Sequence, residues 1–184
     1  RVHPIITKGG DLVNSVPADV RIETYVRAKT MEAIEATHKK VDTALKAGGD
    51  AVGAQTVIAT MPGQLPLACN NRLNELFVTN AKIAEPNVAV KDAGHFSAST
   101  DMGDVSHLLP VIHPFIGGVD GFLHTADFHV VDFKHAVLLP AKAFAMMIID
   151  LLADDAELAR QIKAEHHPLL TKEEYIAKLD KYFQ

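Results

Sequence analysis

The sequence predicts an α/β protein built from two units. Segments near the N-terminus alternate apolar and polar residues and are followed by a helical period, which is typical of a small α+β layer. Farther along, a continuous apolar run at 105–116 lies between polar and glycine-rich turns, which indicates a buried strand. The linker at 61–66 contains two prolines and a glycine, so we place the boundary there, with domains at 1–62 and 63–184. With 184 residues, 48% of them hydrophobic, the chain is long enough for one ordinary domain or two small ones.

The first unit is expected to contain two strands, a helix and a third strand. Residues 2–7 and 21–27 alternate between an apolar and a polar face. The helix expected at 30–49 starts at a threonine cap and ends at two glycines, and 52–60 is expected to be the third strand. In such a unit the helix covers one face of an antiparallel sheet, and the other face or an edge stays free for a partner.

The second unit is expected to combine helices with short strands. Pro140 lies within its longest apolar helical pattern, so this helix either starts near the proline or kinks there. The elements expected in order are a helix at 70–83 capped by Asn70 or Asn71, a short strand at 88–90, the strand at 105–116, an apolar helix ending near Ala153, and charged helices at 154–165 and 171–182.

Composition excludes several classes of partner. The formal net charge is −5 with both signs mixed along the chain, so no basic stripe is available and we expect no nucleic-acid partner. No apolar run approaches the roughly 20 residues of a membrane helix, since the longest, at 143–153, contains Asp150. The single Cys69 cannot form an intrachain disulfide, which favours a reducing compartment and therefore the cytoplasm. Because the chain opens directly on a strand-like segment without Met, we expect that an upstream part has been removed.

The stretch at 97–128 gathers hydroxyls, carboxylates, three histidines and four glycines around the apolar run. His124 is its first candidate for a functional residue, because it follows glycine-rich turns just after the expected strand. Thr125 and Asp127 come next and can orient an imidazole through its other nitrogen. An ordinary surface-loop histidine is the alternative.

A polar turn at 99–104 precedes the apolar run and begins with Ser99, Thr100 and Asp101. Such a turn can present hydroxyl and backbone N–H groups to a carboxylate or a carbonyl. The commoner alternative is an Asx or Ser/Thr turn that only starts a strand.

The remaining histidines have simpler interpretations. His107 and His113 are six residues apart and so share one face of the expected strand, most simply as core histidines with satisfied hydrogen bonds. His3, on the first expected strand, is a candidate substrate contact. The pair at 166–167 precedes a proline and indicates a helix terminus, where imidazolium complements the helix dipole. A hydrolytic metal site needs three or more protein ligands and a base, whereas this chain offers one convincing ligand, His124.

Four ordered motifs resemble those of a known family. An R-x-H, GG and N-x-x-P pattern lies at 1–17, a strand follows at 25–30, an S-T-D-x-G-[DN]-V-S signature lies at 99–106, and a His-Thr pair begins at His124. The chain resembles the C-terminal half of M20 family metallopeptidases and amidohydrolases, particularly the branch that contains aminobenzoyl-glutamate hydrolase and the M20 domain-containing protein 2 dipeptidases. The similarity runs from Arg1 to about Leu152.

The resemblance implies a fold and a chemistry. It implies the C-terminal part of a zinc-exopeptidase-like α/β catalytic domain and part of an α+β, ferredoxin-like lid that also forms a homodimer. It further implies two divalent metal ions, zinc or manganese, with His124 as a metal ligand. Asn14 and Arg27 would be lid residues that contact the carbonyl or carboxylate of a small amide or dipeptide substrate, and Ser99 and Thr100 would line its pocket.

Two departures from the family pattern matter. Ala98 replaces the glycine that usually starts the signature. The Cβ of alanine limits how closely another backbone or a ligand can approach this point. The first metal ligands, the bridging Asp and the general-base Glu of the family lie upstream and are absent. We therefore expect a fragment of an amidohydrolase that is active at full length and inactive by itself, acting on aminobenzoyl-glutamate, an N-acyl amino acid or a dipeptide. The alternative is a non-enzymatic dimerisation or interaction module.

Overall fold

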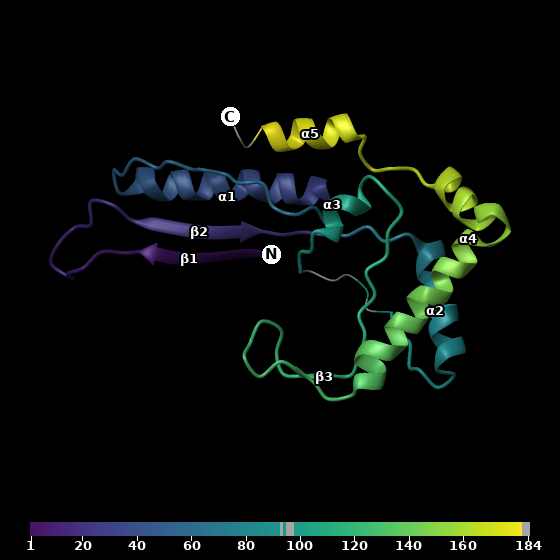
Figure 1. Cartoon of the computed structure of the whole chain (residues 1–184). Helices are drawn as coiled ribbons and strands as arrows, with labels where there is room; N and C mark the ends of the chain where they lie inside the picture. Colours follow the sequence, from purple (N-terminus) through teal and green to yellow (C-terminus); the bar gives the residue numbers. More distant parts are fainter. Residues whose placement is uncertain (93, 95–97, 182–184) are drawn as a thin grey trace. The chain divides into compact units, whose positions relative to one another are not determined.

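The computed structural model describes residues 1–92, 94 and 98–181 (Figure 1). The chain divides into two compact units, of which the first holds residues 1–66 and Ala98 and the second holds 67–92, 94 and 99–181. The division falls after Pro66, in the proline-containing linker, while the assignment of these units to particular domains stays a prediction.

The first unit is a β-hairpin with one long helix. Strands β1 (Val2–Lys8) and β2 (Arg21–Val26) pair antiparallel from Val2 opposite Val26 to Ile6 opposite Ile22, and a bulge precedes the pairing of Lys8 with Arg21. Both strands were expected from their alternation. Helix α1 (Met31–Ala51) follows, capped by the Thr30 side chain, which accepts from Ala33 N.

The third strand expected at 52–60 is wrong, because α1 continues to Ala51 and the following segment joins no ladder. Ala54 N donates to Gly49 O, and the Thr60 hydroxyl lies 3.4 Å from His38 Nε2 of α1. The segment therefore runs back along the helix. Of its larger apolar side chains, Ile58 is half-buried whereas Val52 and Val57 are exposed, so the apolar pattern does not mark a paired strand here.

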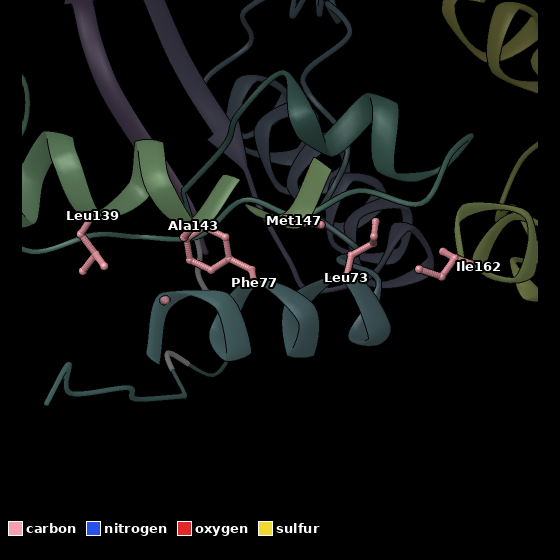
Figure 2. Packing of buried hydrophobic residues seen from close by; sticks show 7 residues of the cluster. Leu73, Phe77, Leu139, Ala143, Met147 and Ile162 are labelled. Carbon is pink, nitrogen blue, oxygen red and sulfur yellow. The ribbon is translucent and has the colours of Figure 1, made fainter. Parts of the chain in front are cut away.

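The core of the second unit lies between two helices. Helix α2 (Asn71–Ala84) was expected with Asn70 as its cap, and the Asn70 side chain does accept from Leu73 N. Helix α4 (Leu139–Glu165) packs against α2, and Figure 2 shows Phe77 beside Ala143 and Met147. The buried cluster consists of Leu73, Phe77, Ala81, Leu139, Ala143, Met147 and Ile162.

Helix α4 carries the expected irregularities. Pro140 lies in its first turn, where a missing N–H costs nothing, and a π-helical turn (Lys134–Leu138) precedes it. The backbone φ and ψ angles are no longer helical at Ala153 and are left-handed from Asp154 to Ala156. The expected end of the apolar helix near Ala153 is therefore confirmed. The final helix α5 (Lys172–Asp180) begins with a capping box formed by Thr171 and Glu174.

The strand expected at 105–116 is also wrong. The polar turn leads into a short helix, α3 (Met102–Ser106), and the chain from 107 to 118 forms no ladder. Prolines at 110 and 114 remove backbone donors, and Asn70 N bonds the carbonyl of Val111, so this segment is held by burial and single hydrogen bonds. His107 and His113 consequently share no strand face.

Two smaller differences complete the second unit. Residues 88–90 form no strand. A hairpin unexpected from the sequence pairs β3 (Val119–Asp120) with β4 (His129–Val130). The Ser97 end of the functional stretch and the Tyr182 end of the last expected helix lie outside the described residues.

The described chain mixes helices with small two-stranded sheets, which is consistent with an α/β fold. The helical segment Lys134–Glu165 is long and apolar enough to cross a membrane by length and composition alone, contrary to the expectation that no apolar run approaches that length. The core helix of a soluble protein passes the same test, and one face of α4 packs against α2.

Candidate functional site

His124 lies in the loop that joins β3 to β4. Its φ of 65° places it in the left-handed region, which non-glycine residues adopt rarely and in which histidine is several-fold enriched. The residue is exposed, and no hydrogen bond from the described part of the chain holds its ring. Both imidazole nitrogens are therefore available to a ligand.

The loop around His124 is ordered by its own polar groups. The Thr125 hydroxyl donates to Phe122 O at 2.6 Å and contacts the Asp127 carboxylate, while His129 Nδ1 lies 2.6 Å from Asp127 O. Thr125 and Asp127 were expected to orient the imidazole. They bond each other and the loop backbone instead, so they hold the backbone that carries His124.

Gly118 anchors this hairpin to the start of the π-helical turn. Its carbonyl accepts from the backbone N–H groups of Val131 and Asp132 at 3.0 Å, and its φ is +94°. A Cβ there would lie 2.6 Å from Asp132 O and 2.7 Å from Ala136 N. The glycine is therefore required both by its conformation and by the close approach of backbone.

The Ser99–Thr100 turn leads into α3 and touches a histidine. Thr100 Oγ1 lies 3.4 Å from His113 Nδ1, and the His113 ring stacks on Phe115 with centroids 5.6 Å apart. Ser99 is exposed and Thr100 is half-buried. The turn thus presents hydroxyls near an imidazole, an association that the sequence spacing does not reveal.

The signature segment also ties the second unit together. Ser106 is fully buried, donates to Gly103 O and accepts from Ala68 N. Asp104 accepts a hydrogen bond from the Tyr175 hydroxyl of α5. The pKa of Tyr175 is raised, mainly because the hydroxyl is partly buried and also because the negative Asp104 carboxylate lies beside it. Ser106 and Asp104 of the signature therefore stabilise the packing of the second unit.

In the first unit, Arg27 and His3 lie at one end of the hairpin. His3 is directly opposite Tyr25, and the Arg27 guanidinium lies over the Tyr25 ring at 5.0 Å from its centroid. Arg27 Nε is buried without a hydrogen-bond partner in the described structure. A planar guanidinium with an unsatisfied N–H is suited to grip a carboxylate.

Asn14 lies in the loop at the other end of the same hairpin and is exposed. The length of β1 and β2 puts about 20 Å between Asn14 and Arg27. The structure therefore brings Arg27 and His3 together, and it does not bring Asn14 to them within one copy of the chain.

A second oriented imidazole escapes the sequence pattern. His135 Nδ1 donates to Asp132 Oδ2 at 2.6 Å, and this bond holds the pKa of the Asp132 carboxyl below its usual range. Asp132 also accepts from His135 N, as in a helix cap, so a D-x-x-H spacing before an apolar helix is the signal that could have found the pair. Next to it, the Lys134 ammonium lowers the pKa of Glu85.

A cleft of about 370 Å³ lies elsewhere in the second unit, at the start of α2 and the end of α4. An ion pair of Arg72 and Glu165 at 2.6 Å lies on its wall, and His166 Nε2 is buried there without a partner in the described structure. None of the predicted site residues lines this cleft. His166 caps the C-terminus of α4, as expected from the sequence.

Within the described residues, no group of three or more His, Cys, Asp and Glu side chains could hold a metal ion. His124 can supply one imidazole and no more. The donor set of this chain therefore does not fit a complete di-metal site, and no catalytic step through a metal follows from these residues alone.

Comparison with known proteins finds distant similarity to dipeptidases. The chain is 31% identical over 166 residues to the Xaa-Arg dipeptidase of Mus musculus, covering 86% of this chain and 38% of that protein. It is 27% identical over 184 residues to the Xaa-Arg dipeptidase of Homo sapiens, covering 96% of this chain and 42% of that protein. No family model and no solved structure matches. The chain thus spans about two fifths of the length of these relatives, and the similarity supports a dipeptidase-like hydrolase at the level of a peptidase or amidohydrolase family.

Proposed function

We propose that the chain is part of a metal-dependent amidohydrolase of the M20 type that cleaves an amide or peptide bond next to a free carboxylate. The observation that carries this is the alignment with Xaa-Arg dipeptidases over 86% and 96% of the chain. Candidate substrates are a dipeptide ending in arginine, aminobenzoyl-glutamate or an N-acyl amino acid. The proposed enzyme is cytoplasmic, binds neither nucleic acid nor membrane, and forms a homodimer through its first unit.

Arg27 is the proposed carboxylate-binding residue. Its guanidinium is already positioned by the Tyr25 ring, and the terminal amino groups of this half-buried side chain can pair with a carboxylate in two places. His3 lies beside it as a further donor to the same group.

Asn14 is proposed to donate to the substrate carbonyl, where an amide N–H stabilises developing negative charge. Because about 20 Å of hairpin separates it from Arg27, the two cannot hold one dipeptide from the same copy. In the proposed homodimer they contact substrate at different sites. Ser99 and Thr100 are proposed to line the pocket in the second unit, where Thr100 is fixed by His113.

His124 is proposed as one ligand of a pair of zinc or manganese ions, whose other ligands and general base come from polypeptide beyond these 184 residues. Bound metal ions would polarise the scissile carbonyl and lower the pKa of the attacking water. The role of this chain is to hold an exposed imidazole on a hairpin tip that its own hydrogen bonds keep ordered.

The test compares His124→Ala with His167→Ala in the natural gene product. His167 is an exposed histidine outside the proposed site and serves as the matched control. Metal content by mass spectrometry and product release from arginine-terminated dipeptides should both fall at least about a hundredfold or to background in the first variant only. Unchanged occupancy and turnover after His124→Ala would rule the assignment out.

A non-enzymatic dimerisation module is the second candidate. It is favoured by the exposed apolar side chains of β1, among them Ile5 and Ile6, on a hairpin that no third strand covers within the described chain. Reading the natural open reading frame separates the two. A His-x-Asp motif and a Glu-Glu pair upstream of Arg1 support the enzyme, whereas a start codon just before Arg1 supports the module.

A further inference from the structure

Helix α4 has an apolar face that nothing in the described chain covers. Its inner residues, such as Ala143 and Met147, are buried against α2. On the opposite side, Ile148, Ile149 and Leu152 have 55%, 67% and 62% of their surface exposed. We call this the outer face of α4 and define it as Ala141, Ala145, Ile148, Ile149 and Leu152, together with Leu138, which directly precedes the helix.

The outer face has the pattern of a packing surface. Residues 138, 141, 145, 148 and 152 alternate spacings of three and four, which places them on one continuous stripe about 20 Å long. None of these six residues is charged or polar. Isolated apolar side chains are ordinary on a surface, whereas a continuous stripe of this kind marks an interface.

The accessible area of the chain points the same way. The chain exposes 13493 Å². Two separate compact domains with the masses of the two units would expose about 10,000 Å², by the scaling of surface with mass. Contact between the two units could only lower the exposed area, so the excess belongs to the units themselves. The exposed apolar side chains of the outer face of α4 contribute to it.

A lipid bilayer is a poor occupant for this face. The regular part of α4 ends at the left-handed residues Asp154 to Ala156, which makes the apolar stripe shorter than the roughly 30 Å of a hydrocarbon core. The inner side of the same helix holds Asp150, whose carboxylate accepts from the buried Asn80 amide at 2.7 Å. One side of this helix is thus already packed against protein, and the stripe on its other side is too short to span a bilayer.

We propose that the outer face of α4 is the docking surface for the further polypeptide that corresponds to the unmatched length of the relatives. The chain aligns with 38% and 42% of two dipeptidases, so about three fifths of such a protein is available to cover it. The occupant presents an apolar helix or sheet face to the stripe. The proposal concerns packing and does not depend on catalysis.

The experiment measures cysteine labelling on the outer face. In a Cys69→Ser background, Ile148→Cys and Leu152→Cys are introduced separately into the 184-residue chain and into the natural gene product. Ile176→Cys on α5 is the matched control, because Ile176 is a comparably exposed isoleucine outside the stripe. Maleimide labelling at 148 and 152 should be at least about tenfold slower in the longer product, with little change at 176.

Three results would overturn the proposal. The first is equal labelling of 148 and 152 in both proteins, or a natural product with no further polypeptide. The second is labelling of the 184-residue chain that slows as its own concentration rises, which assigns the face to a second copy. The third is slowing by phosphatidylcholine vesicles alone, which assigns it to a membrane. Loss of dipeptidase activity without loss of protection would count against the proposed function only.

Discussion

Asn80 is the polar side chain on which the packing of α2 against α4 most depends. It is 2% exposed, and its amide donates to Leu76 O at 3.1 Å within α2 and to Asp150 Oδ2 at 2.7 Å on α4. A hydrogen bond to a charged group contributes about 1.5–3 kcal/mol when buried. Because Asp150 itself is exposed to water, we expect the interhelical bond to contribute about 1–2 kcal/mol to the free energy of unfolding.

The measurement is a double-mutant cycle followed by urea unfolding and far-UV circular dichroism. Asn80→Ala should lower the free energy of unfolding by about 2 kcal/mol, because packing is lost along with the bond. Asp150→Ala should lower it less, and the double variant should reveal a coupling energy of about 1 kcal/mol. Asp150→Asn is the control, since it keeps shape and an acceptor but removes the charge. Additivity within about 0.3 kcal/mol would show that the two helices are not joined through this pair.

Two further predictions concern Gly118, just before the hairpin that carries His124, and Asp132, just after it. Gly118→Ala should destabilise the hairpin by about 1–3 kcal/mol and raise amide exchange at 119–130, because a Cβ at φ +94° meets backbone at 2.6 Å; unchanged exchange would contradict the packing described. The His135 hydrogen bond lowers the pKa of Asp132 from 3.8, so its stabilisation is present above that value and is lost as the pH falls through the lowered pKa. Asp132→Asn should therefore make unfolding less sensitive to pH below about 5, and acid titrations that superimpose on the parent's would refute this.

The parts of the fold that were predicted correctly are those with local causes. Thr30, Asn70 and Thr171 cap helices through their own side chains, and each capping bond involves a residue three positions away. The β1–β2 hairpin likewise follows from alternation in two adjacent segments. Both the capping bonds and the alternation depend only on residues close together in the chain, so they can be recognised from the sequence alone.

The two wrong strands have a cause that is not local. Residues 52–60 and 105–116 are apolar and partly buried, but a strand needs a partner whose N–H and C=O groups are free. In the described chain, the first segment packs along α1 and the second contributes Val111 to the core of the second unit. An apolar pattern predicts that a segment is buried. It predicts a hydrogen-bonded strand only when a neighbouring strand is available to pair with it.

The same distinction explains what could be predicted of the candidate site. Glycines and a histidine in a loop correctly indicated an exposed imidazole on a turn, and the left-handed φ of His124 gives that turn its unusual character. The family resemblance, which implies that Asn14 and Arg27 are both substrate contacts of the lid, could not reveal that they lie at opposite ends of one hairpin. A sequence motif identifies residues that recur together, and it does not tell how far apart they lie in space. The uncovered stripe of α4 and the exposed imidazole of His124 are independent observations, and the proposed docking of further polypeptide would account for both.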